Sequence, residues 1–343
     1  MRKILIVGLA LVLAACRIQS TPRPAPTPFS GTPRTIVIDA DMGSDDWMAI
    51  LYLLNRADVQ IQAITVTGTG LAHAEPGARN ALGLVALAGQ PEIPVAAGRE
   101  TPLAGDHSFP SDWRTDADML SGLSLPSNPH AISSQSAVEL LTSTIQSAPV
   151  KVTILALGPL TDIAELLQAN PAVEENIEAI YIMGGAVDVP GNVGSSGVGI
   201  DNQTAEWNIY CDPHAASIVF ESGVPITLIP LDATNHVPAT SRFYNRMKND
   251  HITPEATFVF DLLTKHKGQL NGGYYFWDPL AAAILTENSL AAVETRQLIV
   301  VEEGSESGRT QEVSEGGAAI RVAVNADRER FEQLFLDTLN ASE

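Results

Sequence analysis

The chain has 343 residues, 45% of them hydrophobic, and the part that follows a short leader is long enough for one large α/β domain or two small ones. No second change of composition along the chain favours two domains. The 40 acidic and 20 basic residues give a formal net charge of −20, which argues against a polyanion such as DNA or RNA as a partner and is compatible with a small neutral ligand.

The chain opens with the layout of a secretory signal. Two basic residues precede an apolar run, residues 4–15, that is too short to span a bilayer. The run closes on Leu-Ala-Ala-Cys, which resembles a bacterial lipobox and implies cleavage of a signal peptide, residues 1–15, and lipidation of Cys16. The protein is then expected outside the cytoplasm, held at the cell membrane or envelope by its lipid anchor alone. The alternative is an uncleaved hydrophobic leader.

Residues 16–34 are predicted to be a tether. They are rich in Pro, Ser and Thr, with almost no side chains that could form a core, which is typical of a semi-extended linker. The folded domain is expected to span residues 35–343. Because lipidation uses the thiol of Cys16, only Cys211 remains, and no intrachain disulfide can form.

The domain is predicted to be a Rossmann-like α/β fold, with a mostly parallel central sheet and helices on both faces. Apolar runs typical of strands alternate with helical patterns along the chain. The predicted strands are 35–38, 61–66, 150–157, 177–183 and 225–230, and the predicted helices begin near 47 and span 77–88, 137–146, 162–168 and 213–222. In such folds ligands bind beyond the carboxyl ends of the strands.

Four aspartates fall within eight residues, where the first predicted strand ends and a helical pattern begins. They are Asp39, Asp41, Asp45 and Asp46. The helix dipole favours acidic groups at this position by roughly 0.3–1 kcal/mol each, but repulsion between carboxylates a few ångströms apart exceeds that gain. A hard cation such as Ca²⁺ or Mg²⁺ would resolve the conflict. The alternative is an ordinary helix N-cap, with Gly43 shaping the turn.

The segment from Asp39 to Ile50 resembles the amino-terminal signature of the inosine-uridine preferring nucleoside hydrolases, D-x-D-P-G-x-D-D-x-x-A-I. Further blocks follow in the order found in that family and extend the resemblance over about residues 35–340. These blocks are 79–82, 94–98, 157–162, 183–186 with 190–192, 205–208 leading to 212–213, and 278–279.

The resemblance implies a Ca²⁺-dependent enzyme that hydrolyses the N-glycosidic bond of ribonucleosides to free base and ribose. The implied metal ligands are the carboxylates of Asp41, Asp46 and Asp278 and the backbone carbonyl of Leu157. Asp41 is implied as the general base as well, because a carboxylate beside the metal can accept a proton from water at neutral pH. The family also implies a homo-oligomer, a dimer or a tetramer.

The ribose contacts implied by the resemblance are Asp45, Asn192, Glu206 and Asn208, with Met183 packing against the sugar. Acceptors for neighbouring hydroxyls favour ribose over deoxyribose, because a missing hydroxyl leaves a buried acceptor unpaired at a cost of about 1–3 kcal/mol. For Glu206 and Asn208 the alternative is a polar pair on an exposed approach to a helix. The glycine-rich residues 193–204 are expected to form a mobile loop beside the site.

Several positions depart from the family pattern. Met42 stands where the signature has Pro, and Ala40 where Thr or Cys is frequent. Asp162 replaces the usual Asn after Leu-Thr, where a helix cap is the simplest explanation. Residues 67–71 lack an Asn that many relatives carry, which leaves one contact of the ribose or of the metal shell in question.

The largest departure is Trp277, which stands immediately before Asp278, where inosine-uridine members have a His thought to protonate the leaving base. Stacking on indole rings can activate the base instead, and Trp113, in a loop expected to be irregular, offers a second aromatic surface at about 1–3 kcal/mol per stacked base. We therefore expect purine-leaning or broad specificity. Core packing is the alternative for both tryptophans, and His107 and His236 are alternative proton donors.

Three functions fit the sequence. The first is a lipid-anchored ribonucleoside hydrolase. The second is a nucleoside- or sugar-binding lipoprotein with little or no turnover, which the missing His favours. The third keeps the hydrolase chemistry but acts on another N-riboside, such as a nicotinamide riboside. The retained aspartates favour an enzyme, because a binding protein does not need a metal-activated water.

Overall fold

The computed structural model describes residues 29–341. The predicted signal peptide, Cys16 and most of the tether lie outside this range. Within it, none of the helices combines the length and the apolar character needed to cross a membrane.

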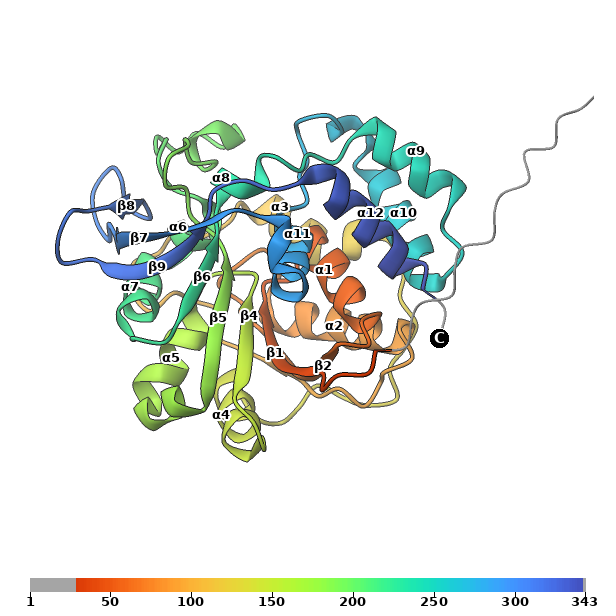
Figure 1. Ribbon diagram of the computed structural model, residues 1–343, viewed down its shortest axis with the longest axis horizontal. Helices are drawn as coiled ribbons and strands as arrows, with labels where there is room; N and C mark the ends of the chain where they lie inside the picture. The colour runs from red at the N-terminus through yellow and green to blue at the C-terminus, as the bar shows by residue number, and fades with distance from the viewer. Residues whose placement is uncertain (1–28, 342–343) are drawn as a thin grey trace, which may run out of the picture.

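The described residues fold into alternating strands and helices (Figure 1). The strands are β1 (Arg34–Ala40), β2 (Val59–Val66), β3 (Val95–Ala97), β4 (Val152–Ala156), β5 (Ile177–Met183), β6 (Ile226–Ile229), β7 (Val293–Val300), β8 (Thr310–Glu312) and β9 (Ala318–Ala323). The helices are α1 (Ser44–Leu54), α2 (Ala74–Leu87), α3 (Ser111–Asp118), α4 (Ala137–Ser147), α5 (Thr161–Ala169), α6 (Trp207–Cys211), α7 (Pro213–Glu221), α8 (Leu231–Thr234), α9 (Ser241–Asn249), α10 (Pro254–Lys265), α11 (Trp277–Thr286) and α12 (Arg328–Leu339). Short 3₁₀ turns span Leu120–Gly122, Pro171–Asn176, Gly194–Ser196, Lys267–Gln269 and Asn288–Leu290.

A nine-stranded sheet in the order β3-β2-β1-β4-β5-β6-β9-β7-β8 runs through the domain. All pairs from β3 to β9 are parallel, while β7 pairs antiparallel with both β9 and β8. The fold is thus a single α/β domain with a mostly parallel sheet, as predicted. The antiparallel edge, which extends away from the body of the domain in Figure 1, was not predicted.

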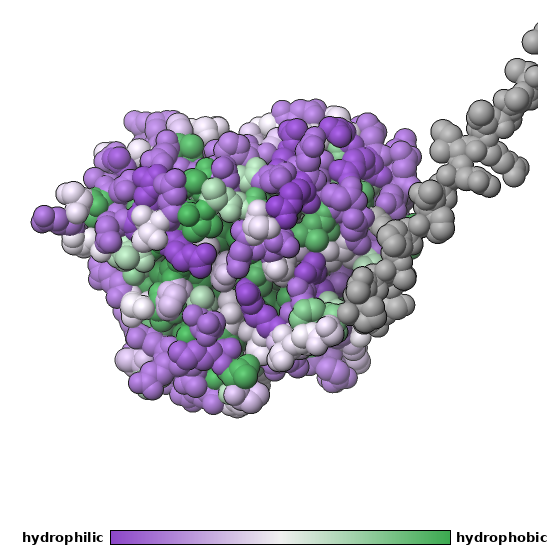
Figure 2. Space-filling view, viewed as in Figure 1, coloured by the Kyte–Doolittle hydropathy of each residue, from purple (hydrophilic) through white to green (hydrophobic). Residues whose placement is uncertain are grey.

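Two hydrophobic cores lie on opposite faces of the sheet. Along β1, Ile36, Ile38 and Ala40 point into a core built with α1, α2, α10, α11 and α12, whereas Val37 points into a core built with α4, α5 and α7. This alternation is the two-residue period of a strand buried on both faces. The face shown in Figure 2 is largely hydrophilic, with hydrophobic residues gathered in small groups.

The predicted elements agree closely with the observed ones up to β6. The strand predicted at 177–183 has the bounds of β5, and the helix predicted at 137–146 is α4, one residue longer. One local prediction is wrong: Trp113 lies in a regular helix, α3, rather than in an irregular loop. Pro110 precedes α3 at the N-cap position, where a proline does not interrupt the hydrogen bonds of the helix.

The order in which successive strands join the sheet changes direction at β1. From β1 the chain adds β2 and β3 on one side, and it then crosses over to add β4, β5 and β6 on the other. In the register between the two central strands, Asp39 lies opposite Ala156. Asp41 and Leu157 therefore leave the sheet side by side at its topological switch point, which is where open α/β sheets bind their ligands.

Candidate functional site

Asp41 is enclosed by main chain at the end of β1. It is 2% exposed, and its two carboxylate oxygens accept from the backbone N–H groups of Gly43 (3.3 Å) and Leu71 (3.1 Å). A Cβ added at Gly70 would lie 2.1 Å from the Cβ of Asp41, and one at Gly158 would lie 2.6 Å from it. Glycine at both positions lets two loops close on the carboxylate and fix its orientation.

Met42 links Asp41 to the turn before α1 in a strained conformation. Its φ of +59° lies in the left-handed region, which costs a non-glycine residue about 1–3 kcal/mol. The carbonyl of Met42 accepts from the indole N–H of Trp47 at 2.8 Å, and both side chains are fully buried. Proline cannot adopt a positive φ, so the proline of the family signature is incompatible with this backbone, and the departure at position 42 affects more than the local stiffness expected from the sequence.

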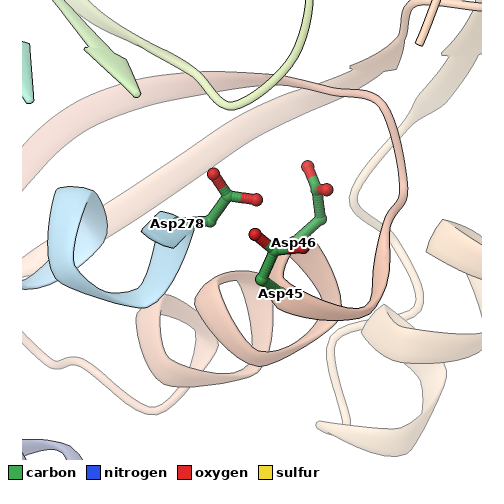
Figure 3. A group of neighbouring side chains, drawn as sticks. All are labelled: Asp45, Asp46 and Asp278. Carbon is green, nitrogen blue, oxygen red and sulfur yellow. The ribbon is translucent and has the colours of Figure 1, made fainter. Parts of the chain in front are cut away.

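Asp45, Asp46 and Asp278 form a cluster of three carboxylates. Each offers an oxygen within 4.8 Å of the others, although Asp45 and Asp46 begin α1 and Asp278 begins α11, more than 200 residues later (Figure 3). Asp46 also accepts from the N–H of Gly43 at 2.8 Å, which caps α1. Gly43 is the N-cap residue and has no side chain to cap the helix, so the N-cap alternative accounts for one oxygen of Asp46 and leaves the rest of the cluster unexplained.

The carboxylates of the site have raised pKa values. Burial raises the pKa of Asp45 to about 7, with a further contribution from Asp41. Burial also raises the pKa of Asp46 and of Asp278 well above the usual range, and neighbouring carboxylates add to both shifts. The Oδ1 atoms of Asp46 and Asp278 are buried and have no hydrogen-bond partner within residues 29–341. Buried anionic oxygens without donors match a cation site.

The candidate metal ligands fit a hard divalent cation. Asp41 interacts directly with Asp46, which brings the predicted general base to the cluster. The predicted ligands Asp46 and Asp278 are both members of the cluster, and Asp45, predicted as a ribose contact, is its third member. All the candidate ligand atoms are oxygens, which is the preference of Ca²⁺ and Mg²⁺.

Glu206 is a buried carboxylate at the start of α6, 3% exposed. Its side chain caps α6 by accepting from the N–H groups of Asn208 (3.0 Å) and Ile209 (3.3 Å), and it also accepts from the N–H of Gly185 at 2.9 Å. Burial raises the pKa of Glu206 to about 7. The alternative of an exposed polar pair is wrong, because both Glu206 and Asn208 are buried.

The side-chain amides of Asn208 and Asn192 each use one of their two polar atoms in hydrogen bonds to the backbone. The Nδ2 of Asn208 donates to the carbonyls of Leu157 (3.2 Å) and Met183 (3.1 Å), and the Oδ1 of Asn192 accepts from the N–H of Trp207 at 3.1 Å. Met183 is the last residue of β5 and is 2% exposed. The site residues predicted on β4, β5 and α6 thus come together.

The loop that carries Asn192 is anchored to the antiparallel edge of the sheet. The Oδ1 of Asn202 accepts from the N–H of Ala205 at 3.0 Å, and its Nδ2 donates to the carbonyl of Ser307 at 2.8 Å. Asn192 in turn donates its N–H to the carbonyl of Ala205 at 3.0 Å. Asn202 was not recognised in the sequence, because nothing in its neighbourhood distinguishes it from other polar loop residues.

Two separate aromatic groups adjoin the site. Trp113 contacts Trp207, with ring centroids 5.7 Å apart, and Phe109 stacks on the same indole at 4.7 Å. Trp277 contacts Tyr274 and Tyr275, each with ring centroids 5.6 Å away. Both predicted tryptophans are half-buried rather than sealed in a core. Each group is joined along the chain to a predicted site residue, since Trp207 follows Glu206 and Trp277 precedes Asp278.

Tyr274 is a site neighbour that the sequence did not reveal. It is 4% exposed, and its hydroxyl lies 2.7 Å from the hydroxyl of Ser44, the residue before Asp45. Burial raises its pKa well above the usual range, and Asp45 adds to the shift. A tyrosine three residues before Trp277 could have been noticed, but only the fold brings it to the start of α1.

The two histidines considered as proton donors differ in their surroundings. His107 stacks on Tyr210 with ring centroids 4.0 Å apart, and its Nδ1 lies 2.8 Å from the carbonyl of Tyr210, so Nδ1 is held as a donor to main chain. His236 is exposed at the end of α8. His107 therefore belongs to the aromatic group of Trp207, whereas no described contact ties the side chain of His236 to the site.

Comparison with known proteins gives a consistent result. The profile of the family described as inosine-uridine preferring nucleoside hydrolase matches residues 36–333. The pyrimidine-specific ribonucleoside hydrolase RihA of Klebsiella pneumoniae is 33% identical over 274 residues, which cover 78% of this chain and 85% of that protein.

Solved structures agree with this relationship. An inosine-uridine preferring nucleoside hydrolase from Bacillus anthracis superposes with a TM-score of 0.79 at 27% identity, covering 90% of this chain and 100% of that one. A purine-preferring ribonucleoside hydrolase from Gardnerella vaginalis gives a TM-score of 0.75 at 28% identity, covering 90% and 98%. With the fold, the acidic cluster and the buried polar residues already described, this chain belongs to the inosine-uridine preferring nucleoside hydrolase family and is a nucleoside N-ribohydrolase.

Proposed function

We propose that this chain hydrolyses ribonucleosides to free base and ribose with Ca²⁺ as its resident cation. The observation that carries the proposal is the pair of buried, unpartnered Oδ1 atoms on Asp46 and Asp278 within the three-carboxylate cluster. Asp41, Asp46, Asp278 and the carbonyl of Leu157 would hold the cation. When bound, it neutralises the buried charge and lowers the pKa of water at the site.

Asp41 is the proposed general base. Hydrolysis adds the oxygen of water to the anomeric carbon, while the base departs with the electron pair of the glycosidic bond, and one proton of that water must be accepted. The N–H groups of Gly43 and Leu71 hold the two oxygens of Asp41 in place without supplying a full positive charge. The carboxylate therefore stays oriented and can accept the proton.

The ribose is proposed to bind between the acidic cluster and α6. Asp45 belongs to the cluster, Asn192 and Asn208 each offer the amide atom that their internal hydrogen bonds do not use, and Glu206, whose two oxygens already accept from backbone N–H groups, offers the remaining lone pair of Oε1. Hydroxyls held by buried acceptors discriminate against a deoxy sugar, since the unpaired acceptor costs about 1–3 kcal/mol. We expect 2′-deoxynucleosides to be turned over roughly 5- to 150-fold more slowly than ribonucleosides.

For the base we propose broad specificity that includes purines. The aromatic groups of Trp113 and Trp277 offer π surfaces next to predicted site residues, and stacking favours the larger purine ring. Similarity does not decide the preference, because the relatives include proteins named as pyrimidine-specific and as purine-preferring. With Trp in place of His at position 277, stacking and a proton from water are proposed to assist the departing base.

The test is release of base and ribose from a panel of uridine, cytidine, inosine, adenosine and guanosine by the full-length protein, with Ca²⁺ and with chelator. We expect release that chelator abolishes and that is lost in Asp41→Ala. Tight binding without release would instead indicate a nucleoside-binding lipoprotein. Turnover of uridine far above that of all three purine nucleosides would contradict the proposed base specificity. Turnover of nicotinamide riboside alone would indicate that the enzyme hydrolyses another class of N-riboside.

We also propose that the protein is exported and lipid-anchored through Cys16. The support is the sequence alone, in the signal-like run that ends in Leu-Ala-Ala-Cys. Mass spectrometry of the membrane fraction should find a mature chain that starts at a diacylated Cys16. A Cys16→Ala protein that is still lipidated would exclude this anchor.

A further inference from the structure

The guanidinium of Arg114, in α3, contacts the loop between β2 and α2, residues 67–73, which we call the β2–α2 loop. The side chain of Arg114 is largely buried, with 13% of its surface exposed. Its Nη2 atom donates to the carbonyl of Gly68 at 2.6 Å and to the carbonyl of Ala72 at 3.4 Å. The half-exposed carboxylate of Glu100 lies 3.3 Å from the same atom. One nitrogen of Arg114 therefore reaches the main chain near both ends of the β2–α2 loop.

The β2–α2 loop is also the segment that orients Asp41. The N–H of Leu71 donates to Asp41 Oδ2 at 3.1 Å, and the N–H of Ala72 donates to the carbonyl of Asp41 at 2.8 Å. Gly70 approaches so closely that an added Cβ would lie 2.1 Å from the Cβ of Asp41. Gly70 and Leu71 lie between the two carbonyls that Arg114 contacts. The guanidinium thus fixes the stretch of main chain that encloses the carboxylate.

The other end of α3 is attached to α2 by separate contacts. Asp118 accepts from the N–H of His73 at 2.8 Å, and its other oxygen lies 2.8 Å from the Nδ1 of the same histidine. The Nδ2 of Asn80 donates to the carbonyls of Ala117 and Asp118 at 3.1 and 3.2 Å. These contacts do not involve the guanidinium. Its removal is therefore expected to free the β2–α2 loop while α3, with Trp113, stays in place.

The burial of Arg114 has a cost that the stability of the fold does not explain. Its Nε atom is buried and has no hydrogen-bond partner within residues 29–341. A buried donor without a partner costs about 1–3 kcal/mol, and fixing a long side chain adds a loss of rotamer entropy. Proteins accept such local costs mainly at functional sites. The contacts of Arg114 with the loop around Asp41 supply such a function.

We propose that Arg114 is a positioning residue for the hydrolysis, which holds the β2–α2 loop against Asp41 and so keeps this carboxylate oriented to accept a proton. It acts through the main chain of the loop rather than through contact with the substrate. The inference rests on the proposed role of Asp41 as general base. Nothing in the sequence indicated it, because Arg114 and the loop it contacts are more than 40 residues apart.

Amide hydrogen exchange and kinetics of full-length Arg114→Met test the proposal. The amides of Leu71 and Ala72 should exchange faster than in wild type, as measured by mass spectrometry of the peptide that contains them. The kcat for the nucleosides of the panel should fall by up to about 100-fold, since a misplacement of about 1 Å can have an effect of this size. KM should change little, because Asp118 still holds α3. A merely destabilised fold would instead exchange faster throughout the chain.

Two further variants accompany Arg114→Met. Arg330→Met is the matched control, because Arg330 also donates to a main-chain carbonyl, that of Ser289 at 3.0 Å, but beyond the carboxyl end of α11, whereas Asp278 begins that helix. It should match wild type in kcat and in the exchange of the β2–α2 loop. Arg114→Lys keeps a charged donor on a shorter side chain and should recover part of the kcat lost in Arg114→Met.

Wild-type exchange of Leu71 and Ala72 in Arg114→Met would overturn the proposal, and so would faster exchange with a wild-type kcat while Asp41→Asn is inactive. Activity retained in Asp41→Asn would instead contradict the general base of the proposed function. If Arg114→Met does not fold, Arg114→Lys decides. Faster exchange of the loop with a lowered kcat in Arg114→Lys supports the positioning role, and wild-type values of both would overturn it.

Discussion

The side-chain amide of Asn208 donates to the backbone carbonyl of Leu157 at 3.2 Å, which joins the proposed ribose contact to the proposed metal ligand. The same Nδ2 donates to the carbonyl of Met183 at 3.1 Å, so one side chain connects the ends of β4 and β5. The sugar side and the metal side of the site are therefore mechanically coupled.

Asn208→Asp is expected to lower kcat/KM and Ca²⁺ affinity together. The carboxylate would face two carbonyl oxygens without a proton to donate and would add charge beside an acidic cluster. The loss of a buried hydrogen bond is worth about 1–3 kcal/mol, or roughly 5- to 150-fold in kcat/KM. Asn235→Asp, at an exposed position, is the control and should match wild type. Wild-type kinetics in Asn208→Asp would contradict the coupling.

Calcium is expected to stabilise the folded protein by binding the acidic cluster. A ligand at 100 times its Kd contributes about 2.7 kcal/mol, so the unfolding temperature should rise measurably when Ca²⁺ is added to chelated protein. Asp278→Asn removes one carboxylate of the cluster and should shrink this rise. Equal responses in calorimetry of wild type and Asp278→Asn would argue against Asp278 as a ligand.

The metal-free protein is expected to lose stability as the pH rises from about 4 to about 7. Burial raises the folded-state pKa of Asp45 and of Glu206 to about 7, while both groups titrate near 4 when unfolded. The folded state thus holds protons that the unfolded state releases, and the stabilisation present at low pH disappears as the pH passes through 7.

Two further measurements check this pH dependence. Glu206→Gln removes one of the titrating groups and should flatten the fall in unfolding temperature between pH 5 and pH 8. Ca²⁺ should oppose the fall, because it binds the deprotonated carboxylates and therefore binds more tightly as the pH rises. Stability that increases with pH in the presence of chelator would contradict the prediction.

Met42→Pro, which restores the residue of the family signature, is expected to destabilise this chain. Met42 has a φ of +59°, and proline requires a φ near −65°, so the turn before α1 must rearrange. We expect a loss of at least about 1 kcal/mol in the free energy of unfolding. Met42→Leu keeps the buried volume and the allowed backbone, and should cost less. Denaturant titration of both variants gives the comparison.

Replacing either tryptophan beside the site should affect purine nucleosides more than uridine. Loss of a stacking surface costs about 1–3 kcal/mol per base, so we expect KM for inosine to rise by roughly 5- to 150-fold in Trp113→Ala or Trp277→Ala. Uridine, with its smaller ring, serves as the internal control for folding. Equal changes for both substrates would mean that the tryptophans support the fold rather than the base.

The sheet and the first helices could be predicted because their sequences carry strong periodic signals. Ile177–Met183 is apolar apart from Glu178, its last four residues are buried, and its predicted bounds match β5. β7 (Val293–Val300) lies near the edge, where three of its first five residues are exposed, and its polar residues hide the strand. Pairing with β9 and β8 determines that this segment is a strand, and the local sequence pattern does not indicate it.

Some residues of the candidate site could likewise be predicted from the sequence, and others could not. The rule that ligands bind at the carboxyl ends of strands places Asp41 and Asp46 at the site, whereas Asp278, in the first turn of α11, was predicted only through the resemblance to the family. The partners that hold the site, such as Tyr274 beside Ser44, come from segments without a motif. The left-handed conformation of Met42 was also beyond prediction, since the family signature has proline at this position and proline cannot adopt a positive φ.

Residues at the antiparallel edge of the sheet hold loops that are synthesised much earlier. Thr310 exchanges hydrogen bonds with the main chain of Ala186, donating at 2.8 Å and accepting at 2.9 Å, and Ser307 holds Asn202. Both belong to the last tenth or so of the chain, whereas the loops they secure carry the proposed sugar contacts. During synthesis these contacts can form only late, so a prematurely terminated chain that contains every family motif would still lack the anchors of the proposed sugar contacts.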